Sequence, residues 1–244
     1  YVLHLYLEKC QLNLLHYLQS ENKTSTDIIQ LSKDVLAAVK FLHEVGVAHR
    51  DVKLENILVT EGVSGMRAKL CDFGTMFELD SSLESFLVEL DSEKVLHTTT
   101  NVYIAPEFLS HENLQKLYKE HTKLMRCYAL IYNSFYKNYT LIDHSLAKLG
   151  GLQNNEKKIF LRTLVRGIDV FSTGLVLMEM FYYAFCATNE ALLTFLNCLK
   201  DCLSPIETRS LNVDTNSLFS LFTNTPMRQS ANTQSVVELS NNPT

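Results

Sequence analysis

Two short segments hold the residues whose types could do chemistry. The first is the run His49, Arg50, Asp51, Val52, Lys53, Leu54, Glu55, Asn56, and the second is Asp72, Phe73, Gly74. A carboxylate can accept a proton, an ammonium group can neutralise phosphate, and amide and carboxylate oxygens suit a hard cation such as Mg²⁺. Transfer of a phosphoryl group needs these components close together. The alternative is a solvated loop in which Arg50 and Asp51 form a local ion pair.

The order and spacing of the two segments resemble the catalytic loop and the metal-binding motif of eukaryotic-type protein kinases. The resemblance implies that Asp51 orients the substrate hydroxyl and accepts its proton, while Lys53 neutralises the transferred phosphate. Thr100 would hydrogen-bond both of these side chains. Asn56 and Asp72 would hold Mg²⁺ against the phosphates of ATP. ATP and Mg²⁺ are therefore the implied cofactors.

Three later motifs follow in the order of the same family. They are Ala105-Pro106-Glu107 at the end of the activation segment, residues 169–174 at the start of the central C-lobe helix, and residues 225–231 near the end of the chain. The resemblance implies that Asp169 holds the backbone of His49 and Arg50. It also implies a buried ion pair between Glu107 and Arg228, although these could be two unrelated surface charges.

The first residues resemble the last strand of a kinase N-lobe running into the hinge, where nucleotide binds. The implied ATP-binding residues are Leu7, Glu8, Cys10, Asn13, Leu58 and Cys71. Leu7 falls at the gatekeeper position, and backbone groups of Glu8 and Cys10 would meet adenine. A rival interpretation makes residues 1–19 an amphipathic packing segment.

The substrate class and the regulation are also implied by the resemblance. Lys53 and Thr100 fit the Ser/Thr-specific pattern better than the Tyr-specific one, which makes a protein hydroxyl the expected substrate. Arg50 beside Asp51 implies regulation by a phosphate on the activation segment. The candidate positions are Ser81, Ser82, Ser85, Ser92, Thr98 and Thr99.

The elements that must position these residues can be read from apolar spacing. We expect a strand over residues 1–8, a short helix near residues 12–19, and a long amphipathic helix capped by Thr26. A hairpin is expected over 57–59 and 68–71, then a polar break over 149–158 and an apolar helix over 168–185. The predicted fold class is α+β: a mainly α-helical kinase C-lobe with short β-hairpins and one residual N-lobe strand.

Two of the departures from the family bear directly on function. It contains no Gly-rich loop and no strand lysine, so we expect a fragment without the N-lobe, inactive by itself. Glu107 and Asp169 lie 62 positions apart, which suggests an insertion over about 110–166 that could bind a protein partner. The expected domains are 1–10 (strand and hinge), 11–235 (C-lobe) and 236–244 (polar tail). A non-catalytic kinase-like binding module is the alternative function.

The composition of the chain indicates which broad class of protein it belongs to. The chain has 244 residues, is 46% hydrophobic and carries a net charge of −5, which allows a sizeable core and gives no sign of nucleic-acid binding. Its six cysteines are scattered and suggest free thiols in a reduced compartment. The longest apolar run, residues 174–187, is shorter than the roughly 20 residues of a membrane span. We therefore expect an intracellular, cytoplasmic protein.

Overall fold

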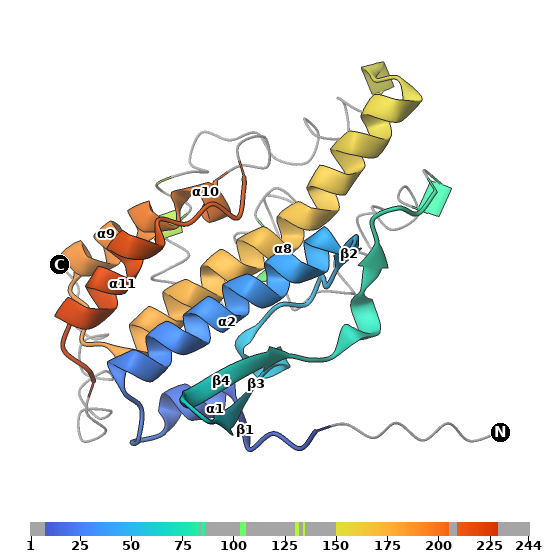
Figure 1. Ribbon diagram of the computed structural model, residues 1–244. Coiled ribbons are helices and arrows are strands. Elements are labelled where there is room, and N and C mark those ends of the chain that lie inside the picture. The colour runs from blue at the N-terminus through green and yellow to red at the C-terminus, as the bar shows by residue number, and fades with distance from the viewer. Residues whose placement is uncertain are drawn as a thin grey trace, which may run out of the picture.

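The computed structural model shows two long helices, α2 and α8, lying side by side (Figure 1). It describes residues 8–82, 84–85, 103–105, 130–131, 134, 150–204 and 209–228. A small sheet packs against α2, and three short helices gather beside the second half of α8. Helices predominate over short strands in the described residues, which confirms the expected α+β class.

Helix α2 (Ser25–Glu44) carries the apolar face that the sequence predicted. Its buried apolar side chains recur at spacings of three and four: Ile28, Leu31, Val35 and Val39. The predicted N-cap, Thr26, is wrong. The cap is Thr24, whose backbone is still extended and whose hydroxyl accepts a 3.1 Å hydrogen bond from the N–H of Asp27. Gly46 follows the helix with φ +82°, a left-handed conformation that ends it without steric cost.

The expected hairpin is confirmed, and its strands run closer to the turn than predicted. Strand β3 (Ile57–Gly62) pairs antiparallel with β4 (Gly65–Leu70), and β1 (Leu12–Asn13) adds to the other edge of β3. Gly62 pairs with Gly65, where φ is +116°. That backbone conformation allows two residues to close the turn, which is why both strands reach it.

Several short elements surround this hairpin. They are α1 (Leu14–Gln19), β2 (Val47–Ala48), the 3₁₀ turns η1 (Leu54–Asn56) and η2 (Phe73–Thr75), and β5 (Phe77–Glu78). Helix α1 starts later than the predicted residue 12, because Leu12 and Asn13 pair with β3 instead. Strand β2 pairs antiparallel with β5, so the chain just after α2 lies beside the chain just after Asp72.

Helix α8 (Asn154–Ala184) is much longer than the apolar helix predicted over 168–185. The polar break expected over 149–158 is wrong from Asn154 onward. The backbone N–H of Gln153 bonds to the carboxylate of Glu156 in a capping box that begins the helix. Residues 154–166, expected within an insertion, therefore form the first half of this helix. The domain boundaries themselves remain predictions.

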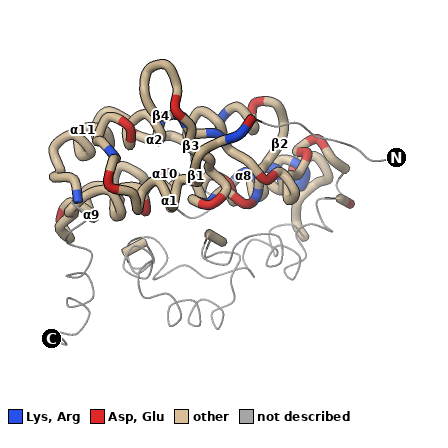
Figure 2. The backbone as a smooth tube through the Cα atoms, turned by 90° about the horizontal axis from the view of Figure 1, so that it is seen from below, with Lys and Arg blue, Asp and Glu red and all other residues tan. Residues whose placement is uncertain are grey.

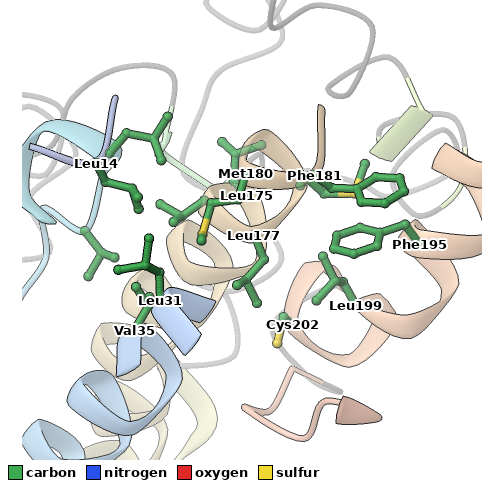
Figure 3. Close-up of a cluster of buried hydrophobic side chains, with 14 of the residues drawn as sticks. Leu14, Leu31, Val35, Leu175, Leu177, Met180, Phe181, Phe195, Leu199 and Cys202 are labelled. Carbon is green, nitrogen blue, oxygen red and sulfur yellow. The ribbon is translucent and has the colours of Figure 1, made fainter. Parts of the chain in front are cut away.

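The main core lies around the second half of α8 (Figure 3). Helices α9 (Asn189–Cys198), α10 (Lys200–Leu203) and α11 (Thr215–Asn224) close over it. The rings of Phe181 and Phe195 stack with centroids 4.3 Å apart. At Gly174 a Cβ atom would come within 2.9 Å of side-chain atoms of Cys202 and Leu203, so glycine lets α10 approach closely.

Several predictions fall on residues that the structure does not describe. They concern the strand over residues 1–7, Thr100, Glu107, most of the segment 110–149, and the tail. Within the described ranges, no helix is both long enough and apolar enough to cross a membrane.

Candidate functional site

A carboxylate on α8 holds the loop that carries the candidate catalytic residues. Asp169 is fully buried, and its two oxygens accept hydrogen bonds from the backbone N–H groups of His49 (2.8 Å) and Arg50 (2.6 Å). The ring of His43, near the end of α2, lies 2.9 Å from the same carboxylate. A buried carboxylate is costly unless it is hydrogen-bonded in this way. No local sequence pattern marks His43, since its role depends on how α2 and α8 pack.

Two residues of the candidate site have strained backbones. Among the described residues other than glycine, positive φ occurs only at Arg50 (+67°) and Asp72 (+63°). Each such residue costs on the order of 1 kcal/mol or more and persists only where its surroundings enforce it. The backbone N–H groups of His49 and Arg50, both bonded to Asp169, hold Arg50 in this conformation.

Three predicted residues meet at one carboxylate group. Asp51 is 9% exposed, and its Oδ2 accepts hydrogen bonds from Lys53 Nζ (2.7 Å) and Asn56 Nδ2 (2.8 Å). The same Asn56 nitrogen donates to the backbone carbonyl of Asp51 at 2.9 Å. An amide nitrogen with two acceptors fixes the orientation of the group. The amide oxygen of Asn56 accepts no hydrogen bond from any described residue and is left for a cation.

Contacts at His49 and Cys71 fix the two motifs to one another. The ring Nε2 of His49 lies 2.9 Å from the carbonyl oxygen of Cys71, and its ring lies 5.0 Å from that of Phe73. The backbone N–H of Cys71 donates to the carbonyl of Asn56 at 2.9 Å. These bonds hold Asp72 beside the loop, although the two segments are separated by the β3–β4 hairpin.

The donor set fits magnesium better than a metal held wholly by protein. No group of three or more His, Cys, Asp or Glu side chains lies together within the part of the chain that the structure describes. Mg²⁺ needs only one or two protein oxygens when phosphates and water supply the others. Asp72 is exposed, and its Oδ1 has only a long 3.4 Å hydrogen bond from the N–H of Gly74. Asp72 and the amide oxygen of Asn56 are therefore suitable ligands.

The guanidinium of Arg50 ties the start of the activation segment to the loop. It is buried, its Nε donates to the carbonyl of Thr75 at 2.6 Å, and it lies over the ring of Phe77 at 5.6 Å. The hydroxyl of Thr75 donates back to the carbonyl of His49 at 2.9 Å. Reciprocal hydrogen bonds of this kind keep the segment after Gly74 at a fixed distance from Asp51.

A buried acid that the sequence did not assign to the site lies below the loop. The hydroxyl of Tyr103 donates to Glu179 on α8 at 2.6 Å and accepts a 3.4 Å hydrogen bond from the N–H of Leu54. Burial raises the pKa of Glu179 from its ordinary 4.5 to about 8, against the lowering effect of the Tyr103 hydroxyl. A lone glutamate in the most apolar helix was the sequence signal that could have found this pair.

The predicted nucleotide-binding residues flank the sheet. Exposed Glu8 forms an ion pair with Lys69 on β4, and Cys10 is half-buried. Leu58 is half-buried in β3, opposite Asn13. The side chain of Asn13 caps α1, so its oxygen is already occupied. Leu7 lies outside the described residues.

Cys71 is half-buried directly before Asp72. Its thiol donates to the carbonyl of Asn56 at 3.2 Å. Burial raises the pKa of this thiol, and the neighbouring Asp72 and Cys10 raise it further. The reactive thiolate is therefore disfavoured at neutral pH, and packing is the role that the surroundings support.

Two arginines near the end of the chain bind backbone carbonyls, and the predicted ion pair of Arg228 with Glu107 stays untested. Arg228 donates to the carbonyls of Tyr182 (3.1 Å) and Phe185 (3.3 Å), while the expected partner Glu107 lies outside the described residues. Arg209, which the sequence did not single out, is 9% exposed and donates to the carbonyls of Ser204 and Gly167. The Arg209 guanidinium thereby links the end of α10 to the middle of α8 through two backbone carbonyls.

The structure thus places Asp51, Lys53 and Asn56 on one loop that is held by the central helix α8. The family model described as protein kinase domain matches residues 1–133, which is more than half of the chain. The chain belongs to the protein kinase domain family.

Individual relatives agree with that family. The chain is 33% identical over 122 residues to human MAP kinase-activated protein kinase 2, covering 48% of this chain and 28% of the relative. It is 35% identical over 108 residues to a putative ribosomal protein S6 kinase alpha-2 of Caenorhabditis elegans (43% and 14%). It is 33% identical over 102 residues to the serine/threonine-protein kinase PRR2 of Saccharomyces cerevisiae (41% and 13%). The matched part thus spans less than a third of each of these relatives.

One solved structure gives a weaker likeness. It is a chain in the crystal structure of the yeast RNA Pol II CTD kinase CTDK-1 complex, with 18% identity and a TM-score of 0.40. The match covers 76% of this chain and 42% of that one. A likeness at that level places no residue of the site.

Proposed function

We propose that this chain is the catalytic half of a serine/threonine protein kinase, which transfers the γ-phosphate of ATP to a protein hydroxyl. The observation that carries the proposal is the Asp51 carboxylate, held at once by Lys53 and Asn56 in a loop anchored on Asp169. A positioned carboxylate with a cation beside it is what such a transfer requires.

Each residue of the loop has a chemical task in this proposal. Asp51 orients the attacking hydroxyl and accepts its proton, and Lys53 offsets the charge of the phosphoryl group as it moves. By the resemblance to protein kinases, Thr100 would hydrogen-bond both side chains. Asn56 and Asp72 hold Mg²⁺, which would neutralise the charge that builds up on the phosphates.

The adenine of ATP would lie against the sheet. By the resemblance, backbone groups of Glu8 and Cys10 would meet its edge and Leu7 would be the gatekeeper. Leu58 would pack below the ring, and Cys71 would line the side of the pocket. Asn13 has a capping role instead. These 244 residues contain no Gly-rich loop, so we propose that ATP binding also needs an N-lobe encoded outside them. ATP and a protein substrate imply an intracellular site of action.

Regulation would act through Arg50. A phosphate on the activation segment would add a negative charge for its guanidinium to bind, which orders the segment. Of the candidates, Ser81, Ser82 and Ser85 lie within the described residues, and the hydroxyls of Ser82 and Ser85 are 3.0 Å apart.

The test uses the protein expressed from its full open reading frame. Asp51→Asn should lower phosphate transfer to a protein substrate by about 10²-fold or more, because the proton acceptor is lost. Glu61→Gln is the control, since Glu61 is exposed on β3 and contacts none of the site residues. Equal transfer by wild type and Asp51→Asn would overturn the proposal.

A second candidate function is a kinase-like module that binds a partner without catalysis. It is favoured by the missing Gly-rich loop and by the long segment 110–149, which could bind another protein. ATP with Mg²⁺ should then leave the Tm of the full-length protein unchanged. A clear rise in Tm that depends on Asp72 would favour the kinase instead.

A further inference from the structure

We propose that the first half of α8, residues 154–166, is a clamp that fixes the start of the activation segment, with Arg162 as its positioning residue. This inference rests on the proposed function, because it assigns a regulatory contact to the same site. The clamp is defined by its contacts with residues 77–80, which directly follow the Asp72-Phe73-Gly74 motif.

The polar side of the clamp holds the backbone of this stretch. The Nε of Arg162 donates to the carbonyl of Leu79 at 2.8 Å, and its guanidinium forms an ion pair with the Asp80 carboxylate. One turn earlier, Lys158 Nζ donates to the carbonyl of Asp80 at 3.4 Å. Because these bonds reach the carbonyls of Leu79 and Asp80, they hold the backbone as well as the Asp80 side chain.

The apolar side of the clamp buries its own small core. It consists of Ala48, Phe77, Leu79, Leu161, Leu164 and Val165, with Phe160 packed against them. This cluster is separate from the main core around the second half of α8. Because β2, β5 and the clamp each contribute to it, none of the three can move away without exposing apolar surface.

A short series of contacts joins the clamp to the catalytic loop. The N–H of Leu79 donates to the carbonyl of Gly46 at 2.7 Å, and Phe77 pairs with Ala48 across the two-stranded sheet. The Phe77 ring lies under the guanidinium of Arg50. Displacement of Leu79 would therefore shift the contacts of Arg50, the residue directly before Asp51.

A second arm of the clamp reaches the anchor of the loop. The guanidinium of Arg166 donates to the carbonyl of His43 at 2.9 Å, and the ring of His43 bonds to Asp169. The clamp thus contacts two places: the stretch at β5 that follows the Asp72 motif, and His43, which bonds to the Asp169 anchor. Arg162 is 36% exposed in its side chain and Asp80 is 83% exposed, so this contact can exchange with solvent while the anchor cannot.

The experiment is amide hydrogen exchange together with kinetics on the full-length protein. The variants are Arg162→Ala and Arg162→Lys. Lys157→Ala is the matched control, because it removes a positive charge from the same helix and its side chain makes no ion pair or hydrogen bond among the described residues.

Arg162→Ala should raise the exchange rates of the Leu79 and Ser81 amides by about tenfold, since it removes a charged hydrogen bond from the segment. The kcat for phosphate transfer should fall by a similar factor while KM for ATP stays the same, because the nucleotide contacts are untouched. Arg162→Lys keeps the charge and should give a smaller rise, and Lys157→Ala should match wild type.

Unchanged exchange at Leu79 and Ser81 in both Arg162 variants would overturn the clamp. A rise in KM for ATP with kcat unchanged would also overturn it. Arg162→Lys keeps the test decisive if the alanine variant does not fold. Absence of any Asp51-dependent transfer in wild type would sink the proposed function, and the exchange rates would still decide whether the clamp exists.

Discussion

The two halves of α8 bury their residues differently. In the second half, from Gly167 to Phe181, every residue is buried, including the acids Asp169 and Glu179. In the first half only Leu161, Leu164 and Val165 are buried, while Lys158 and Arg162 lie partly in solvent. Buried polar contacts are costly to break, and exposed ones are weak and screened by salt. One helix therefore combines a permanent anchor for the catalytic loop with a releasable contact to the activation segment.

Figure 2 shows how charged residues are distributed along the described chain: basic and acidic residues are interspersed, with no long block of one sign. In the second half of α8 both acids, Asp169 and Glu179, are buried and bind backbone or tyrosine partners. Their positions are where a substitution should separate the two halves most clearly.

The largest effect on stability is expected at Asp169, the anchor of the catalytic loop. Asp169→Ala leaves two buried N–H groups and His43 without their acceptor, and should lower the free energy of unfolding by about 3–5 kcal/mol. Urea denaturation measures this loss. The matching change at the contact made by the first half is Asp80→Ala. A loss below about 1 kcal/mol for Asp169→Ala would erase the distinction between the halves.

A smaller effect is expected at Gly174. The added methyl of Gly174→Ala would meet Cys202 and Leu203 at 2.9 Å, so α10 must shift, at about 1–3 kcal/mol of stability. Thermal unfolding should show a lower Tm. Thr163→Ala in the exposed part of the first half is the control and should stay near wild type. If Gly174→Ala had the same Tm as wild type, α10 would be packed loosely against α8.

The pH dependence of stability should reveal Glu179. Its pKa rises from 4.5 to about 8 on folding, so the folded protein holds a proton that the unfolded chain has lost. Stability is therefore full below about pH 4.5 and declines as pH rises toward 8, by up to about 1.4 kcal/mol per pH unit. Glu179→Gln should flatten this decline in urea titrations at a series of pH values.

Tyr103→Phe is the matched variant for that experiment. It removes the hydrogen bond that lowers the pKa of Glu179, so the decline should extend to higher pH. Superimposable pH profiles for wild type and Glu179→Gln would contradict the assignment of this acid as the titrating group.

The smallest stability effect is expected at the clamp. Asp80→Ala removes an ion pair whose acid is mostly exposed, and should cost less than about 1 kcal/mol and depend on salt. Urea denaturation at low and high salt measures both. A loss as large as that of Asp169→Ala would mean that the clamp is as permanent as the anchor.

The sequence by itself determined the family and most of the local elements. The spacing of Asp51, Lys53, Asn56 and Asp72 indicated the loop, and apolar periodicity located α2 and the hairpin, because both signals are encoded in neighbouring residues. The predicted start of α8, residue 168, was wrong, because the helix begins at Asn154. Its first half is polar on average, and its buried stripe of Leu161, Leu164 and Val165 packs on β2 and β5, which lie far away in the sequence.

Only the tertiary structure decided which distant residues meet. His43, Tyr103 and Arg162 gave no local pattern, because each acts through a partner on another element. Glu179 was visible in the sequence only as a break in an apolar run, and burial is what gives it a raised pKa. Residue types and spacing specify the chemistry of the loop, whereas packing around α8 sets which contacts hold it permanently and which can be released.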